Sequence, residues 1–219
     1  KRRAGMEKRA RGGDKEAKEQ LELIAPLIAG LNEGKPARAI FPPETLRPLQ
    51  LLTGKPVLYV ANVEEARAAT GNAFSAKVAE MAKAEGAGMV VVSAAIEAEI
   101  SQLPDADKGE FLAGLGLADS GLDRVIRAGY ALLGLITYFT VGPKEARAWT
   151  ITKGTRAPQA AGVIHGDFER GFIAAETTAY DDYVSLGGEQ GAKEAGKMRV
   201  EGKDYVVRDG DVMLFRFNV

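Results

Sequence analysis

The sequence contains no cysteine and a single histidine, His165. The absence of cysteine excludes disulfide bridges, thiolate metal sites and cysteine nucleophiles, and it fits a protein of a reducing compartment. A single histidine excludes a histidine-rich metal centre. We therefore expect no metal-ligating residues in this chain.

Long apolar runs and a dominant charge are also lacking. No stretch approaches the roughly 20 apolar residues that a membrane-spanning helix needs, and the basic start has no apolar core of the kind found in signal peptides. The formal net charge is only -1, so the chain as a whole is not drawn to nucleic acid or membrane by charge. The expected protein is globular and cytoplasmic, has no membrane partner, and is by default a monomer.

Residues 1–35 are rich in Lys, Arg, Glu and Ala and predict a helical arm. Between Leu21 and Leu31 the apolar residues recur at spacings of three, four and seven, which is the stripe of an amphipathic helix. The Gly-Gly pair at 12–13 breaks an earlier basic helix, and Asp14 is the expected N-cap of the second helix. The arm is typical of a helical hairpin or a coiled coil.

The next segments predict a linker and a βαβ unit. Prolines at positions 36, 42, 43 and 48 define a linker, residues 36–48, that cannot be continuous helix. Within residues 49–135, apolar strands at 56–61 and 89–93 flank a helix at 74–85, and helices follow near 95–100, 108–115 and 122–133. Strands that are apolar throughout are typical of parallel strands buried on both faces.

Residues 136–219 predict a compact α+β domain. Its expected strands are ITYFT, ARAWTIT, GFIAAET, KMRV, KDYVVR and DVMLFRF, with helices near 157–164 and 180–194. Gly202 and the turn at 209–211 separate the last three strands, which we expect to be antiparallel neighbours.

Polar residues follow each of the two parallel strands. The first strand runs into Asn62-Val63-Glu64-Glu65 and the second into Ser93-Ala94. A right-handed crossover brings both carboxyl ends to the same edge of the sheet, where ligands of such sheets bind. An amide that donates and accepts, beside a carboxylate that only accepts, can read the edge of a heterocyclic base. The alternative is that Asn62 caps a turn and that Glu64, Glu65 and Arg67 form a solvated first helical turn.

Five segments carry a resemblance to a known family. They are KPVLYVANVEE, VVVSAAIEAEI, SGLDRVIRAGYALLGLITYFTVG, ARAWTITKGTRAPQAAGVIHGDFERGFIAAE and EGKDYVVRDGDVMLFRFNV. Together they resemble the YchF family, also called the Obg-like ATPase family, from about Glu33 onward. The resemblance implies a P-loop NTPase fold of the GTPase type, with a parallel sheet and helices, a coiled-coil insertion and a C-terminal TGS domain of β-grasp fold.

The same resemblance implies an ATP site and a ribosomal partner. The guanine-reading N-K-x-D motif of GTPases becomes N-x-x-E in this family, and Asn62 and Glu65 match it, with Val63 available for a backbone contact to adenine. Ser93 and Ala94 match the Ser-Ala loop of the fold. The implied cofactors are ATP and magnesium (Mg2+), and the implied partner is the ribosome, including ribosomal RNA.

The phosphate-binding half of such a site is not found. The motif G-x-x-x-x-G-K-[ST] does not occur, because Gly54-Lys55 is followed by Pro56 and precedes a strand. We expect that the N-terminal half of the nucleotide domain is absent, that the Mg2+ ligands lie in that missing part, and that no catalytic residue is present. This chain alone is therefore predicted neither to hydrolyse ATP nor to bind it tightly.

Three other features have competing interpretations. A basic patch could contact RNA phosphates or be an ordinary solvated helix face; it comprises Lys1, Arg2, Arg3, Lys8, Arg9 and Arg11. A second set could stack on bases or pack in a core; it comprises Tyr138, Phe139, Arg147, Trp149, Lys153, Arg156 and Arg170. His165 has no nucleophile beside it and is expected to be structural. The alternative to an ATP-dependent regulator is thus a pure interaction module for ribosome or RNA.

Overall fold

The computed structural model describes residues 2–218 and has a mixed α/β fold. Contacts divide it into two compact units, unit 1 up to Ala128 and unit 2 from Gly129 onward. The division falls inside helix α7 (Gly121–Leu133), earlier in the chain than the boundary expected at residue 135. Each unit has buried apolar clusters of its own.

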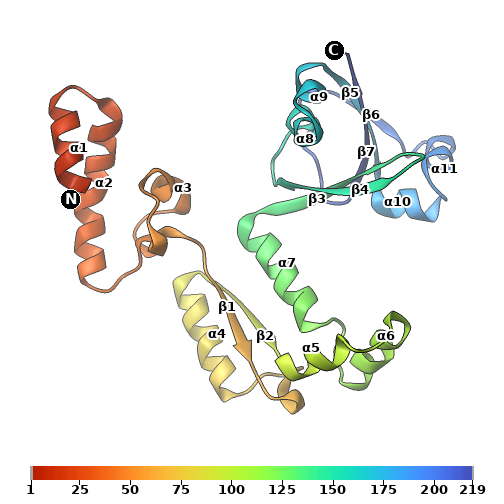
Figure 1. Cartoon of the computed structure of the whole chain (residues 1–219), viewed down its shortest axis with the longest axis horizontal. Helices are drawn as coiled ribbons and strands as arrows, with labels where there is room; N and C mark the ends of the chain where they lie inside the picture. Colours follow the sequence, from red (N-terminus) through yellow and green to blue (C-terminus); the bar gives the residue numbers. More distant parts are fainter. Residues whose placement is uncertain (1, 219) are drawn as a thin grey trace. The chain divides into compact units, whose positions relative to one another are not determined.

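The arm is a hairpin of two helices, α1 (Arg2–Arg11) and α2 (Lys15–Asn32), coloured red in Figure 1. The carboxylate of Asp14 accepts a hydrogen bond from the backbone N–H of Ala17 at 3.1 Å. This hydrogen bond caps the first turn of α2 directly after the turn between the two helices, which confirms Asp14 as the N-cap. The apolar stripe of α2 buries Leu27 in one cluster with Met6 of α1, so the two helices share a small core.

The proline-rich segment folds onto this arm in short turns. It contains η1 (Ala37–Ala39), α3 (Pro43–Leu46), η2 (Arg47–Leu49) and η3 (Leu52–Gly54); only α3 runs directly into the element that follows it. Ala37, Leu46 and Leu49 are buried in the same cluster as Leu27. The segment therefore packs against the arm over most of its length.

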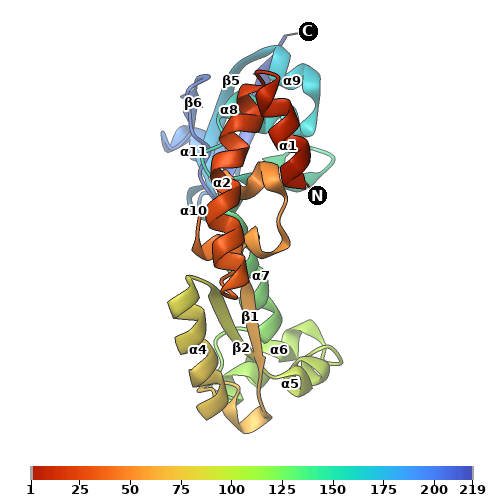
Figure 2. The same cartoon turned by 90° about the vertical axis from the view of Figure 1, so that its left-hand side faces the viewer.

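The predicted βαβ unit is confirmed in unit 1. Strands β1 (Leu58–Asn62) and β2 (Gly88–Val92) pair in parallel, and α4 (Ala73–Glu85) connects them (Figures 1 and 2). A short η4 (Glu65–Arg67) precedes α4, and α5 (Ala94–Ile100) and α6 (Asp105–Gly114) follow β2. Because the strands are parallel, their carboxyl ends lie at one edge, where the two polar loops begin.

A polar cluster ties the proline-rich segment to this βαβ unit. Arg38 donates to the carboxylate of Glu85, the last residue of α4, at 2.8 Å, and the hydroxyl of Tyr59 in β1 donates to the same oxygen at 2.9 Å. Both hydrogen bonds lower the pKa of Glu85, and the bond from Tyr59 has the larger effect. The ionised carboxylate thus holds together three segments that are distant in the sequence.

We expect Glu85→Gln to reduce the acid sensitivity of unit 1. A lowered pKa in the folded state stabilises the fold at neutral pH, and this stabilisation is lost as the pH falls through the lowered pKa. The variant lacks the titrating group, so its thermal midpoint should fall less than that of the parent between neutral and strongly acidic pH. Glu80→Gln, an exposed position on the same helix, is the control and should behave like the parent. An unchanged pH profile in Glu85→Gln would contradict the assignment.

Unit 2 is built on a mixed five-stranded sheet. Its strands are β3 (Leu135–Val141), β4 (Ala146–Thr152), β5 (Phe172–Ala179), β6 (Arg199–Glu201) and β7 (Asp211–Phe217). They lie in the order β4-β3-β7-β5-β6; β3 and β7 are parallel and the other neighbours are antiparallel. The parallel neighbours β3 and β7 are the first and the last strand of the unit in the sequence. The beginning and the end of the unit are therefore paired inside the sheet.

Four short helices accompany this sheet. On one face α8 (Ala157–Ile164) packs its alanines against Tyr138 and Phe215 in the main core, and α9 (Gly166–Arg170) follows it. The short helices α10 (Tyr180–Ser185) and α11 (Glu189–Glu194) follow β5. One helix was predicted over 180–194; the chain breaks it at Gly187 and Gly188, whose φ angles of 76° and 113° are left-handed.

The prediction of a strand at KDYVVR is wrong. The N–H of Ala157 donates to the carbonyl of Tyr205 at 2.9 Å, and the N–H of Val207 donates to the carbonyl of Thr155 at 3.0 Å. The backbone groups of this segment are thus used by the loop before α8. The expected antiparallel order of the last strands is also wrong, because β6 and β7 lie on opposite sides of β5.

Candidate functional site

The two polar loops meet at the carboxyl edge of β1 and β2. Asn62 pairs with Val92 at the end of the strand ladder, and Ser93 and Ala94 follow directly. The backbone N–H of Ala94 donates to the side-chain oxygen of Asn62 at 2.9 Å. Asn62 and Ser93 therefore lie next to each other at the carboxyl ends of the two strands, as the predicted crossover requires.

This hydrogen bond fixes which half of the Asn62 amide faces outward. The oxygen is used by Ala94, and the exposed side chain retains its NH₂ group as a donor. A donor at this position suits a ring nitrogen with a lone pair, such as N7 of a purine. Since adenine and guanine share N7, Asn62 can hold a purine but cannot distinguish the two bases.

Of the two backbone polar groups of Val63, the N–H is used within the sheet and the carbonyl can accept from a ligand. Its N–H donates to the carbonyl of Val92 at 2.8 Å, and its side chain is buried. A ligand can thus use the carbonyl of Val63 but not its N–H. A backbone carbonyl accepts, so it favours an amino group over a keto group at the facing position of a base.

The two glutamates after Val63 have different environments. The carboxylate of Glu64 accepts from the side-chain amide of Asn72 at 3.1 Å, and Asn72 is the N-cap of α4 with a reciprocal capping bond to Ser75. Glu64 is thereby part of the start of that helix. Glu65 is exposed at the first position of η4. Of the two carboxylates, Glu65 is the one that local structure leaves to a ligand.

Ser93 carries a buried hydroxyl at the same edge. The residue is 2% exposed, and among the described residues its side-chain oxygen has no hydrogen-bond partner. Its carbonyl accepts from the N–H of Glu97, which starts α5. An unpaired buried hydroxyl costs about 1–3 kcal/mol, so a water or ligand polar group at this loop would be stabilising.

The aromatic and basic residues of unit 2 do not form one stacking face. Tyr138 is fully buried and donates to the carbonyl of Ala160 at 2.8 Å. The indole N–H of Trp149 donates to Thr140 at 2.9 Å, and the guanidinium of Arg147 lies 5.7 Å from the centre of the Trp149 ring. The interpretation of Tyr138 as a base-stacking residue is therefore wrong, because the side chain belongs to the core.

The remaining candidates are held in local polar contacts. The imidazole of His165 accepts from the N–H of Asp167 at 3.2 Å and caps α9, a structural role as expected. In the basic patch, Arg3 pairs with Glu7 and Arg9 with Asp14. Lys1 and the side chain of Arg2 lie outside the described residues.

The described residues offer no metal centre and no membrane span. Within 2–218, no group of three His, Cys, Asp or Glu side chains could hold a metal ion. The residues present therefore do not provide a protein site for the implied magnesium ion. In the same part of the chain, no helix is both long and apolar enough to cross a bilayer.

A family model named YchF-GTPase_C, described as a protein of unknown function, matches residues 135–218. The chain is 53% identical over 218 residues to the ribosome-binding ATPase YchF of Haemophilus influenzae and 52% identical over 220 residues to that of Bacillus subtilis. Each match covers 98% of this chain and 60% of the relative. The chain thus spans about 60% of the length of these curated relatives.

Solved structures agree with these relatives. The YchF GTPase of Schizosaccharomyces pombe superposes with a TM-score of 0.78 at 34% identity, covering 92% of this chain and 55% of that one. A GTP-binding protein of Pyrococcus horikoshii, 19% identical, has a TM-score of 0.54 over 80% of this chain and 48% of that one, and shares the fold. On the sequence identity across 98% of its residues, the chain belongs to the YchF family.

Proposed function

We propose that this chain carries the adenine-reading loops of an ATP site. The observation that supports this most directly is the 2.9 Å hydrogen bond between the N–H of Ala94 and the side-chain oxygen of Asn62, which joins the two loops at the sheet edge. Asn62, Val63, Glu65, Ser93 and Ala94 are the proposed binding residues. In a complete site, ATP would be bound together with magnesium.

A preference for adenine follows from the proposed contacts. The amide of Asn62 would donate to N7, which both purines have, and the carbonyl of Val63 would accept from the 6-amino group of adenine. Guanine presents its O6 there, and two facing acceptors repel each other. Glu65 is longer than the aspartate that reads guanine in GTPases, so it would not provide the fork for the two guanine donors.

We propose further that the whole protein is an ATP-binding and ATP-hydrolysing regulator that associates with the ribosome. The relatives named ribosome-binding ATPase support this, as does the P-loop fold that the YchF family implies. In this division of the chain, residues 1–35 are a coiled-coil arm, 36–48 a linker, 49–135 the C-terminal half of the nucleotide domain and 136–219 a TGS domain. The sheet order of unit 2, with its parallel central pair, supports a β-grasp module. The proposed location is the cytoplasm.

A second candidate is an interaction module without nucleotide function of its own. It is favoured by the composition of α1, RRAGMEKRAR, in which five side chains are basic and one is acidic. In that case the arm and unit 2 would bind ribosomal components, including RNA, and the base-reading loops would be scaffold. Binding of ribosomal subunits that does not respond to ATP would favour this module.

The nucleotide proposal is tested by titrating the ¹⁵N-labelled chain with ATP and GTP. We expect ATP to shift the amide signals of residues 62–65 and 93–95 with a dissociation constant of about 1 mM, and GTP to shift them several-fold less. The affinity is weak because the sequence has no phosphate-binding loop. For the same reason we expect no release of phosphate from ATP.

Variants assign the contacts. Asn62→Ala should abolish the shifts for both nucleotides, and Glu65→Ala should reduce the selectivity for ATP. Glu64→Ala is the matched control, because its carboxylate is bound to Asn72 and should not affect the nucleotide. Equal shifts with ATP and GTP, or measurable phosphate release, would contradict the proposal.

A further inference from the structure

Unit 2 has an open sheet edge at β4. This strand is bonded to β3 on one side and is the outermost strand of the sheet. The N–H of Lys153 donates to the carbonyl of Gly134 at 2.7 Å, and the N–H of Gly142 donates to the carbonyl of Glu145 at 2.9 Å. Because bonding alternates along an antiparallel pair, odd-numbered residues of β4 bond to β3. The N–H and C=O groups of Ala146, Ala148 and Thr150 are directed to the open edge, whereas the carbonyl of Thr152 accepts from the N–H and hydroxyl of Thr155.

Two of these even-numbered residues, Ala146 and Ala148, line a cavity. Cross-strand pairs share a face, so Ala146 and Ala148 lie on the same face as Val141 and Phe139. A cavity of about 400 Å³ opens on this face, with apolar lining residues Phe139, Ala148, Tyr180, Val184 and Val212, and Arg147 also contributes to its wall. Alanine side chains are short, so a neighbouring strand could place a larger apolar side chain beside them.

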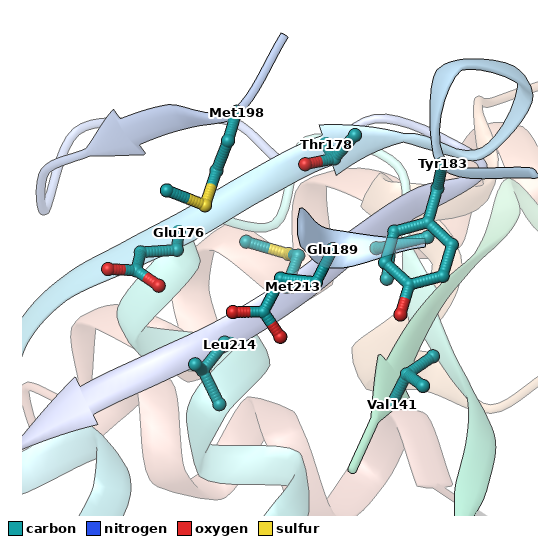
Figure 3. A pocket seen from close by; sticks show the side chains of 9 residues that line it. Val141, Glu176, Thr178, Tyr183, Glu189, Met198, Met213 and Leu214 are labelled. Carbon is teal, nitrogen blue, oxygen red and sulfur yellow. The ribbon is translucent and has the colours of Figure 1, made fainter. Parts of the chain in front are cut away.

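The cavity has a different character at its other end. There it adjoins a smaller hollow, shown in Figure 3, which shares Val141, Tyr183 and Val212 with it and is also lined by Glu176 and Glu189. The carboxylate of Glu176 is nearly buried and paired with Arg216. The exposed carboxylate of Glu189 at this end would repel an acidic ligand, so the end next to β4 suits an apolar group on an acidic partner better.

The opposite face of β4 carries one basic side chain, Arg147, whereas Trp149 and Ile151 on the same face pack in or against the main core. Arg147 projects there with 56% of its side chain exposed, bonded to Glu145 and lying over the ring of Trp149. Residues 142–156 contain four basic side chains, Lys144, Arg147, Lys153 and Arg156, and one acidic side chain, Glu145. A strand added at this edge would place one of its side chains beside Arg147, with its next neighbours on that face beside Glu145 and Trp149.

We propose that β4 is a docking strand for an extended, acidic segment of a partner protein in which apolar and acidic residues alternate. The partner backbone adds to the outward N–H and C=O groups of Ala146, Ala148 and Thr150 as a sixth strand. Its apolar side chains enter the cavity beside Ala148, and a carboxylate on the other face lies beside Arg147. The backbone groups of β4 can bind any extended chain. The cavity on one face and Arg147 on the other favour a chain in which apolar and acidic side chains alternate.

The test uses a defined probe, a blocked peptide of sequence Glu-Val-Glu-Phe-Glu-Val-Glu, titrated into the ¹⁵N-labelled full chain. We expect saturable binding with a dissociation constant of about 10⁻⁴ M, and signal shifts centred on residues 139–150. The same peptide with lysine in place of glutamate should bind at least tenfold more weakly.

Two variants separate the backbone and cavity contributions. Ala148→Pro removes one outward N–H that β3 does not use, a change that edge strands tolerate, and Val184→Glu places a carboxylate at the rim of the cavity, where the side chain is 58% exposed. Each should weaken binding of the peptide at least tenfold while the fluorescence of Trp149 stays that of the parent. Should Ala148→Pro fail to fold, Val184→Glu still decides the question.

Charge is tested by Arg147→Glu, which should weaken binding at least tenfold, against Lys203→Glu, an equal charge change at an exposed turn, which should not. Several results would overturn the proposal. They are the absence of binding at about 1 mM peptide, full binding by the Val184→Glu variant, and displacement of the peptide by a single-stranded RNA oligonucleotide, which would indicate a general polyanion site.

Discussion

Replacing Tyr138 with alanine is expected to unfold a measurable fraction of unit 2 under native conditions. The side chain is fully buried, contacts Phe215 edge to face at 5.9 Å between ring centres, and donates to the carbonyl of Ala160 at 2.8 Å. Truncating a buried aromatic side chain costs about 3–5 kcal/mol, and the carbonyl of Ala160 would lose its partner as well. That loss is a large part of the total stability of about 5–15 kcal/mol typical of a domain.

The fluorescence of Trp149 measures this effect, because the chain has one tryptophan and it packs against the core of unit 2. The urea midpoint of the Tyr138→Ala variant should fall steeply, whereas Tyr138→Phe should fall by an amount equivalent to about 1–2 kcal/mol. The phenylalanine variant keeps the ring and removes only the hydroxyl. A midpoint in Tyr138→Ala equal to that of the parent would show that this residue is not central to the core.

The second large effect is expected at Asp211. Its side chain is 3% exposed, accepts from the hydroxyl of Tyr205 at 2.7 Å and from the N–H of Arg208 at 2.8 Å, and lies 3.8 Å from Arg199. Burial, together with the bond to Asp211, raises the pKa of Tyr205 to about 12. Removing the carboxylate leaves these donors unpaired, and we expect Asp211→Ala to destabilise unit 2 by about 3 kcal/mol.

Asp209 provides the matched control in the same turn. Its carboxylate is exposed and accepts one bond, from the N–H of Thr137 at 2.7 Å. Asp209→Ala should therefore cost about 1 kcal/mol. Both variants are compared by urea unfolding followed at Trp149. Equal losses in the two variants would mean that burial of Asp211 adds nothing, contrary to our expectation.

The parts of the fold that local chemistry determines were predictable from the sequence. Asp14 capped its helix as expected, and the apolar runs around Val60 and Val90 formed the parallel pair, which placed Asn62 beside Ala94. The crossover rule needs no knowledge of the rest of the protein, so the meeting of the two loops could be derived. Their role in binding ATP stays a proposal.

Pairings that depend on distant segments were not predictable in the same way. Tyr205 and Val207 alternate as in a strand, but their backbone groups are taken by Thr155 and Ala157, about 50 positions earlier. The burial of Tyr138 and the different partners of Glu64 and Glu65 also depend on tertiary contacts. A sequence pattern identifies residues that can bind or pack, and the tertiary fold decides between the two.

The N-terminus of α7 has an unusual anchor with a mechanical consequence. The carboxylate of Glu97, in the first turn of α5, accepts from the N–H of Gly121 at 2.6 Å and from the N–H of Leu122 at 3.1 Å. Ser93 is the N-cap of α5 and Ala94 its first residue, and the carbonyl of Ser93 accepts from the N–H of Glu97. The loop, α5 and the first turn of α7 are therefore joined by hydrogen bonds, so we expect any displacement of the loop to shift the start of α7 with it.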